Sequence, residues 1–516
     1  MAKKQNVVLF GPDGKPLRAS GLYPNPDLTT GKYRPRSYTT ATDTYKSVDI
    51  STRNNLLRYS REFYAQLPNI NGAVNSKANW GFGSGWEPQF NGNNKQWADE
   101  AYDWLMNKWF PICNVRGQNF DFRTSLYLSS IAIDVDGEVL MVLVKTPSGF
   151  PLIRFIRSHR IGTRSSNGWV GGDKVMDKGP YKGLRMIDGV IVNNSLRPLA
   201  YSVLGDKQDA SEDLLISVQS AFLLYEPKYT DQVRGIPASS AGLLDSIDFQ
   251  DCEFFIRRQI KLDSSQGIMH TNETGEPDES ANILTDEDAG LSATPNVLHT
   301  EYIQGGEIMY FKAGGKLEPY KSDRPSPNVE AFLGRIERRI LYAIGWPIEM
   351  VDPSKVGGAS VRLITDMTRQ SISHRQNTVE RKAKIALAYA LSNAMEMGLI
   401  SDNREEDNWW DWSFNRPATI VIDQGYESQA DREAMKLGQT TLSAIAQKQG
   451  KNWYDIREQT TIETEDLLDR AYALMKKYPD LNLSAAINLL SQRASAGVSI
   501  STTKSPPNEA QPDEGK

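Results

Sequence analysis

Residues 326–360 read SPNVEAFLGRIERRILYAIGWPIEMVDPSKVGGAS and contain the features that decide the fold of this chain. A serine followed by a proline supplies an N-cap and an N1 residue, and apolar side chains then recur at helical spacing from Val329 to Ile344. Trp346-Pro347 ends this predicted helix. Residues 351–360 follow with two adjacent glycines, which predicts a mobile loop between two helices.

Two further long helices flank this stretch. The first is predicted over residues 238–262, and the second over residues 361–397, where Gly398 stops it. Between the first helix and Ser326 the composition changes sharply, because residues 271–300 contain seven acidic residues and no lysine or arginine. The order is therefore helix, acidic insertion, helix, loop and long helix.

The part of the chain before residue 238 predicts a mixed α+β unit. Hydrophobic periodicity favours helices over residues 51–67, 71–80 and 95–109, and strands over residues 131–135, 139–144, 151–161 and within 187–203. Asp136-Gly137 is interpreted as the turn of a hairpin. Downstream of the long helix, the patterns predict a strand over residues 418–422 and helices over residues 428–449, 463–477 and 483–493.

Composition excludes several classes of protein. The 516 residues include 39% hydrophobic and 24% charged residues at a mean hydropathy of -0.49, which favours a soluble protein of several packed units. No apolar run suggests a signal peptide or a membrane span. Two cysteines far apart in sequence argue against disulfides and fit a reducing cytoplasm. A net charge of -5 means that any contact with nucleic acid is local or weak.

The motifs of common catalytic sites are missing from the sequence. There is no phosphate-binding loop, no G-x-S-x-G, no H-E-x-x-H and no Cys/His ligand cluster, and the four histidines are scattered. The glycines of residues 81–85 are not followed by the lysine that a phosphate site needs, and Asp134-x-Asp136-Gly137 lacks the later ligands of a calcium loop. The sequence therefore predicts that the protein is not an enzyme and has no cofactor or metal.

Several short sequence motifs, in the same order along the chain, resemble those of the lambda-type portal protein family of tailed bacteriophages. They are Arg61 to Gly85 ending in Gly-Phe-Gly-Ser-Gly, Arg197-Pro-Leu-Ala-Tyr201, Arg234-Gly-Ile-Pro237, Gly345-Trp-Pro-Ile-Glu-Met350, Ala359-Ser-Val-Arg362, Ile422-Asp423, Ala430-Asp431, Gly438-Gln-Thr-Thr-Leu442 and Gly450. The resemblance covers roughly Ser51 to Leu474. It departs from the family at Ala359 to Arg362, where Tyr-Ser-Ser-Ala-Arg or similar is expected.

The resemblance implies a portal fold assembled as a ring, typically of twelve subunits, at one capsid vertex. Its parts would be an extended basic N-terminal arm (1–50), an α+β wing (51–237), a first stem helix (238–266), a clip (267–321), a second stem helix (322–347), a tunnel loop (348–360), a long helix returning to the wing (361–427), a helical crown (428–495) and a disordered tail (496–516). The arm could equally be a disordered N-terminus, since it has no apolar face.

Two sets of site residues follow from these assignments. The expected DNA-channel residues are Asp352, Lys355, Gly357, Gly358 and Arg362, the last because a cation at a helix N-terminus opposes the macrodipole. The expected partner-binding residues of the clip are Glu273, Glu276, Asp278, Glu279, Asp286, Glu287 and Asp288. The alternatives are an ordinary loop between helices and a solvated acidic loop tip without a partner.

The implied function is a channel through which viral DNA is packaged and ejected. The resemblance implies a dodecamer of this chain. The other implied partners are the terminase large subunit, the major capsid and scaffold proteins, a head-tail connector or adaptor, and double-stranded DNA without sequence specificity. The protein is expected in the virion, after assembly in the host cytoplasm. A packaging ATPase-nuclease is disfavoured because the phosphate-binding loop is absent. A non-portal capsid or tail-adaptor protein remains the alternative.

Overall fold

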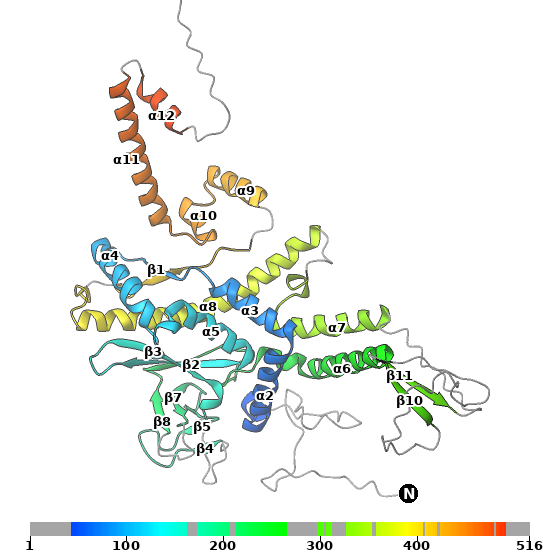
Figure 1. The fold of residues 1–516 in the computed structure, drawn as a ribbon. Coiled ribbons are helices and arrows are strands. Elements are labelled where there is room, and N and C mark those ends of the chain that lie inside the picture. Colours follow the sequence, from blue (N-terminus) through cyan, green and yellow to red (C-terminus); the bar gives the residue numbers. More distant parts are fainter. Residues whose placement is uncertain are drawn as a thin grey trace, which may run out of the picture. The chain divides into compact units, whose positions relative to one another are not determined.

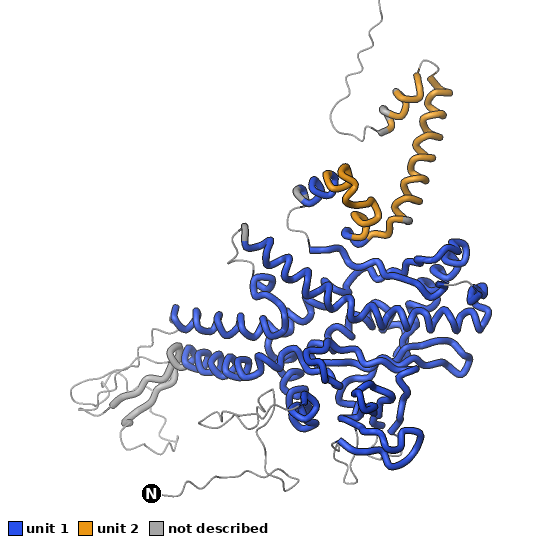
Figure 2. Tube along the Cα trace, turned by 180° about the vertical axis from the view of Figure 1, so that it is seen from behind, with its two compact units in different colours: residues 1–432, 448–450 blue, residues 433–447, 451–516 orange. Residues whose placement is uncertain are grey.

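The structure is a computed structural model, and it describes residues 43–162, 173–205, 213–265, 297–303, 306–311, 327–352, 358–405, 408–420, 424–478 and 481–491. The chain divides into two compact units (Figure 2). The first contains residues 1–432 and 448–450, and the second contains residues 433–447 and 451–516. Residues 1–42 of the expected arm, the expected disordered tail and the seven acidic residues expected to bind partners in the clip lie outside the described residues.

The first described segment contains three consecutive helices, α1 (Thr44–Ser47), α2 (Ile50–Gln66) and α3 (Pro68–Phe82). Asp49 caps α2, because its carboxylate accepts a hydrogen bond from the Thr52 amide at 2.8 Å. Pro68 ends α2 and occupies the first turn of α3, where its missing N–H costs nothing. Residues 43–50 were expected in an extended arm, but they form α1 and the start of α2.

A large aromatic core lies between α3 and the long helix α8 (Gly358–Glu396). It is bounded by α4 (Lys95–Trp104), α5 (Phe122–Val135) and a two-stranded sheet of β1 (Glu87–Phe90) and β12 (Trp412–Asn415). The predicted strand over residues 131–135 is wrong, because these residues form the last turns of α5. Asp121 caps this helix through the Thr124 amide at 2.6 Å, and burial of one helical face outweighs the strand propensity of the β-branched residues.

Two antiparallel sheets form the rest of the mixed region. The first has the order β3-β2-β9 and the second the order β4-β5-β6-β7-β8. Their strands are β2 (Glu138–Lys145), β3 (Pro151–Arg157), β9 (Ala221–Tyr225), β4 (Lys174–Val175), β5 (Arg185–Ile187), β6 (Val190–Val192), β7 (Pro198–Val203) and β8 (Leu214–Ser217). A shared apolar cluster that includes Leu140, Ile156, Ile187 and Val203 joins the two sheets.

Helices α6 (Leu243–Ser265) and α7 (Pro327–Ile344) run side by side, and a hairpin of β10 (Val297–Ile303) and β11 (Gly306–Phe311) lies between them in sequence (Figure 1). A 3₁₀ turn over Ala238–Gly242 precedes α6. The predicted order of helix, insertion, helix and long helix is confirmed by α6, α7 and α8.

The end of the chain is helical, with α9 (Gln424–Lys436), α10 (Leu442–Lys448), α11 (Trp453–Lys477) and α12 (Leu483–Ser491). The single helix predicted over residues 428–449 is instead two helices, because Gly438 has a φ of +70° and breaks the chain between them. Of the strand predicted over residues 418–422, residues 418–420 are not in a strand and residues 421–422 lie outside the described residues. The described strand nearest in sequence is β12.

Candidate channel and docking elements

The pair formed by α6 and α7 is anchored at the end that joins the rest of the unit. Arg339, near the end of α7, forms an ion pair with Asp245, near the start of α6, at 3.1 Å, so the two helices run antiparallel. Gly242 lets the chain approach α7 closely, since a Cβ at this position would lie 3.1 Å from the Cβ of Ala343. Ile340 and Ile344 are buried at this end.

The other half of the helix pair exposes large apolar side chains. Phe254 and Phe255 on α6 are 59% and 65% exposed, and Phe332 on α7 is 55% exposed. The apolar stripe predicted on α7 is therefore buried only from Ile336 onward. Exposed aromatic residues on neighbouring helices are typical of surfaces that contact other proteins.

Gly345 and Trp346 terminate α7. Gly345 has a φ of +78°, and the Trp346 amide donates to the Leu341 carbonyl at 3.1 Å, which is a Schellman arrangement. The Trp346 side chain is fully buried beside Leu341 and Ile372. The helix end is therefore held by the core rather than left to the loop that follows.

The structure describes only part of the expected tunnel loop. Asp352 is exposed and its amide donates to the Ile348 carbonyl at 2.8 Å. Lys355 and Gly357 lie outside the described residues. Gly358 belongs to the first turn of α8 and not to the loop, and Arg362 is the fifth residue of that helix. The argument from the helix macrodipole for Arg362 is therefore wrong, since the effect falls off within the first turn.

Behind the α7–α8 connection, a buried cluster of charged side chains joins four elements. Arg375 on α8 contacts Asp134 on α5 at 2.7 Å and Glu226, which follows β9, at 2.5 Å. Lys77 on α3 contacts Asp134 at 3.2 Å and donates a hydrogen bond to the Ile344 carbonyl at 3.1 Å. Lys77 thus stabilises the C-terminus of α7, where a positive charge is favoured.

The charges in this cluster keep its acids ionised. Burial alone would raise the pKa values of Asp134 and Glu226, but the guanidinium of Arg375 and the ammonium of Lys77 outweigh burial and lower both. The pKa of Lys77 is lowered by burial, which Asp134 offsets only in part. The paired charges of this cluster therefore link the end of α7 to α8.

A second contact joins the mixed region to the start of α6. The backbone of residues 234–237 passes so close to the turn before β2 that a Cβ at Gly235 would lie 2.2 Å from the Gly137 carbonyl oxygen. Arg234 is buried and pairs with Glu138, whose other oxygen accepts from the Gly235 amide at 2.6 Å. Asp136, beside this crossing, binds Arg61 and Arg157 at 2.7 and 2.8 Å.

Sequence reasoning missed both charged clusters. Asp134 and Asp136 were considered as part of a calcium loop, but each is instead neutralised by basic side chains from distant segments. The carboxylates were visible in the sequence, whereas their partners were not, since nothing local marks Lys77 or Arg375 as buried. In the described part of the chain no group of His, Cys, Asp and Glu residues has the arrangement of a metal site.

Among the described helices, none combines the length and the apolar character that crossing a membrane requires.

Comparison with known proteins identifies the family. Residues 34–376 match the family described as phage portal protein, lambda family. No curated protein matches the chain. The chain therefore belongs to the lambda family of phage portal proteins, a family of structural proteins found in the virion at the capsid vertex, and the alternative of a non-portal capsid or tail-adaptor protein is set aside.

Comparison with solved structures finds chains of gene transfer agent particles. The chain from the neck of an empty particle, computed with C6 symmetry, is 14% identical over 77% of this chain and 94% of that chain, at a TM-score of 0.41. The chain from the virion of a native particle is 13% identical over 77% and 93%, at a TM-score of 0.40. The chain from the native neck, computed with C12 symmetry, is 12% identical over 77% and 93%, at 0.42. These similarities are weak, so the family assignment rests on the sequence match.

Proposed function

We propose that copies of this protein assemble into a closed ring, of twelve subunits by analogy with the family, through which double-stranded DNA passes during packaging and ejection. The observation that carries this proposal is the α6–α7 pair, which exposes Phe254, Phe255 and Phe332 on its outer half within a chain of the portal family. A helix pair with exposed aromatic residues can bury them against the different face of a neighbouring copy, and such head-to-tail contacts close into rings.

The proposed channel holds DNA weakly. The net charge of -5 limits the number of lysines and arginines that can bind phosphates at one time. Each lasting phosphate contact would add affinity and oppose sliding. We propose that Lys355, repeated around the ring, makes short-lived phosphate contacts, with Asp352 and Arg362 as further channel residues. Gly357 would supply backbone freedom to the loop, whereas Gly358 already belongs to α8. Lys355→Glu should lower retention of packaged DNA while rings still form, and unchanged retention would contradict this role.

We propose that residues 267–321, which lie between α6 and α7 in sequence and include the β10–β11 hairpin, form the clip. Its acidic residues would attract basic surfaces of the terminase large subunit during packaging and of a connector or adaptor protein afterwards, because concentrated like charge raises association rates. The major capsid and scaffold proteins would surround the ring at the vertex. Assembly would take place in the host cytoplasm.

Electron microscopy of the purified full chain tests the central proposal. Particles with a central hole, and native mass spectra showing one multiple of the 57.8 kDa subunit, are the expected result. A chain that stays monomeric at every concentration and salt, and that is absent from one vertex of assembled capsids, would overturn it.

A further inference from the structure

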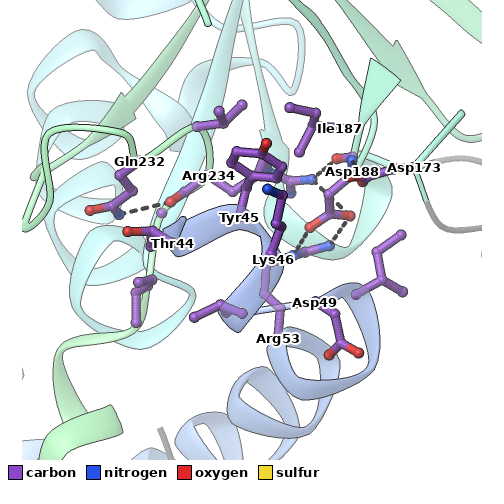
Figure 3. A pocket seen from close by; sticks show the side chains of 15 residues that line it. Thr44, Tyr45, Lys46, Asp49, Arg53, Asp173, Ile187, Asp188, Gln232 and Arg234 are labelled. Carbon is purple, nitrogen blue, oxygen red and sulfur yellow. Dashed lines mark hydrogen bonds and ion pairs between the residues drawn. The ribbon is translucent and has the colours of Figure 1, made fainter. Parts of the chain in front are cut away.

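A cavity of about 280 Å³ lies where the described chain begins (Figure 3). Three segments line it: residues 44–53 of α1 and α2, residues 187–188 with Asp173, and residues 232–236. Ile187 and Ile236 supply apolar walls that are buried in the core. This cavity is separate from the helix pair and from the expected channel residues.

The buried charges that line the cavity are already paired. Arg53 binds Asp188 through two nitrogens, with Nη2 to Oδ1 at 2.9 Å, and donates to the Ser158 hydroxyl at 3.0 Å. Arg234 binds Glu138 as described above. These arginines are therefore not open to an added anion.

Asp49 and Asp173 differ from Asp188, the third carboxylate of the lining, because neither forms an ion pair with any described residue. Asp49 accepts only the capping hydrogen bond from Thr52, and Asp173 accepts the Asp188 amide at 3.3 Å. Arg185 lies over the Tyr45 ring, at 5.2 Å from its centroid, rather than on Asp173. Burial raises the pKa of Asp173, and the charges of Asp188 and Asp49 raise it further. A cation at this rim would relieve that repulsion.

The described chain starts beside the cavity, directly after the N-terminal segment of residues 1–42. Thr44 lines the cavity and is held by Asp231, with hydroxyl to carboxylate at 2.6 Å. The preceding residues 1–42 contain seven lysines and arginines and two aspartates. The nearest cations are Lys32, Arg34 and Arg36. The chain from Arg36 to Asp43 can extend over roughly 23 Å, ample for turning back into a neighbouring cavity.

We propose that residues 32–36 of the chain's own N-terminal segment dock in this cavity. One basic side chain lays its aliphatic stem against the apolar walls and places its charged end beside Asp173 and Asp49. The short tether gives this segment an effective concentration in the millimolar range, which favours it over the same segment of another copy. Docking covers α1 and fastens the start of α2 to the wing sheet.

Carbodiimide cross-linking of the full chain tests the contact, since this reagent couples a lysine to a carboxylate only when the two touch. The natural Lys32 and the variants Arg34→Lys and Arg36→Lys place a reactive lysine at each candidate position. Assemblies formed from mixed light and ¹⁵N-labelled chains distinguish the two sources of the segment. Asp99, an exposed carboxylate on α4, is the reference acceptor, and Lys3, Lys4 and Lys15 are the reference lysines.

The expected products join residue 32, 34 or 36 to Asp173 or Asp49, at least tenfold more often than to Asp99, within chains of a single isotope. Asp173→Asn and Asp49→Ser, which keeps a capping hydroxyl, should remove them. Products with mixed isotopes would assign the cavity to a neighbouring copy and overturn the proposal. Yields no higher than for Asp99, or equal yields from the reference lysines, would also overturn it.

Hydrogen exchange supplies a second readout that does not depend on cross-linking. Replacing Lys32, Arg34 and Arg36 together by serine should speed exchange of the amides of residues 44–50 several-fold. Replacing Lys3, Lys4 and Lys15 by serine removes the same charge and should leave those rates unchanged. Equal effects of the two triple variants would contradict docking at residues 32–36.

Discussion

The ammonium nitrogen of Lys77 lies 3.1 Å from the carbonyl oxygen of Ile344, the last residue of α7. The same nitrogen lies 3.2 Å from Asp134, which Arg375 of α8 also binds. Lys77 therefore links the end of α7 to α8 through Asp134.

Replacing Lys77 by methionine should destabilise the protein by about 3 kcal/mol, because a buried acid loses one of its partners and the Ile344 carbonyl loses a donor. Urea unfolding measures the change. Lys145→Met removes an exposed ion pair with Glu396 and is the matched control, with no measurable change expected. Equal changes in the free energy of unfolding of the two variants would show that the buried ion pairs of Lys77 do not stabilise the protein more than an exposed ion pair does.

The free energy of unfolding should decrease as the pH is lowered through the acid range. Asp134, Glu226 and Asp136 have pKa values below 3.8 for Asp and 4.5 for Glu, the ordinary values that apply in the unfolded chain. Their contribution is complete above the unfolded values and is lost as pH falls toward the folded ones, so the loss begins below about pH 5. Asp173, whose pKa is raised, opposes this trend weakly.

The free energy of unfolding, measured from pH 7 to pH 3, gives the slope directly. Asp134→Asn should make the acid-range slope shallower because one depressed carboxyl is gone. A free energy that does not change with pH, or an Asp134→Asn slope equal to that of the natural chain, would contradict this account of the cluster.

Gly137→Ala should prevent normal folding or cost more than about 3 kcal/mol. Gly137 has a φ of +80°, and an added Cβ would lie 2.6 Å from the backbone carbonyl carbon of Ile236. Gly117 has a similar φ of +91° with no atom within 4 Å of the added Cβ, so Gly117→Ala should cost only about 1 kcal/mol of backbone strain. Thermal unfolding of both variants separates the steric clash with Ile236 from backbone strain. Equal losses of stability in the two variants would show that the close approach of Gly137 to Ile236 does not contribute.

Assembly should depend on the exposed aromatic residues of α6. Replacing Phe254 and Phe255 by serine should reduce ring formation at least tenfold, while far-ultraviolet circular dichroism stays unchanged, since both side chains are exposed in the single chain. Val175→Ser removes a side chain that is 63% exposed on β4 and should leave assembly intact. Native mass spectrometry compares the variants, and rings of normal yield from the double variant would exclude this surface from the interface.

Neutralising the acidic insertion should slow association with a packaging partner. Asp286→Asn, Glu287→Gln and Asp288→Asn together remove three charges, so the association rate with the terminase large subunit and its dependence on salt should both fall. Stopped-flow measurements between roughly 50 and 300 mM salt detect the change. If the rate and its salt dependence match those of the natural chain, the insertion is a solvated loop tip.

Local sequence patterns determined helices α6, α7 and α8 and their order. Pro327, Gly345 and Gly398 act within one helical turn, so their effects on α7 and α8 can be predicted without knowing the fold. The family phrases in collinear order likewise needed no coordinates, and the match over residues 34–376 confirms the portal assignment.

Tertiary structure alone decided which charges are buried and which local propensities prevail. Lys77 and Asp134 are 57 residues apart in sequence, and Asp134 and Arg375 are 241 apart, so only folding brings them together. Residues 131–135 have β-branched side chains that favour a strand, yet they form a helix because their α5 face packs into the core. The physical reason is the same in both cases: caps and turns act between neighbours, whereas burial depends on segments that the sequence places far apart.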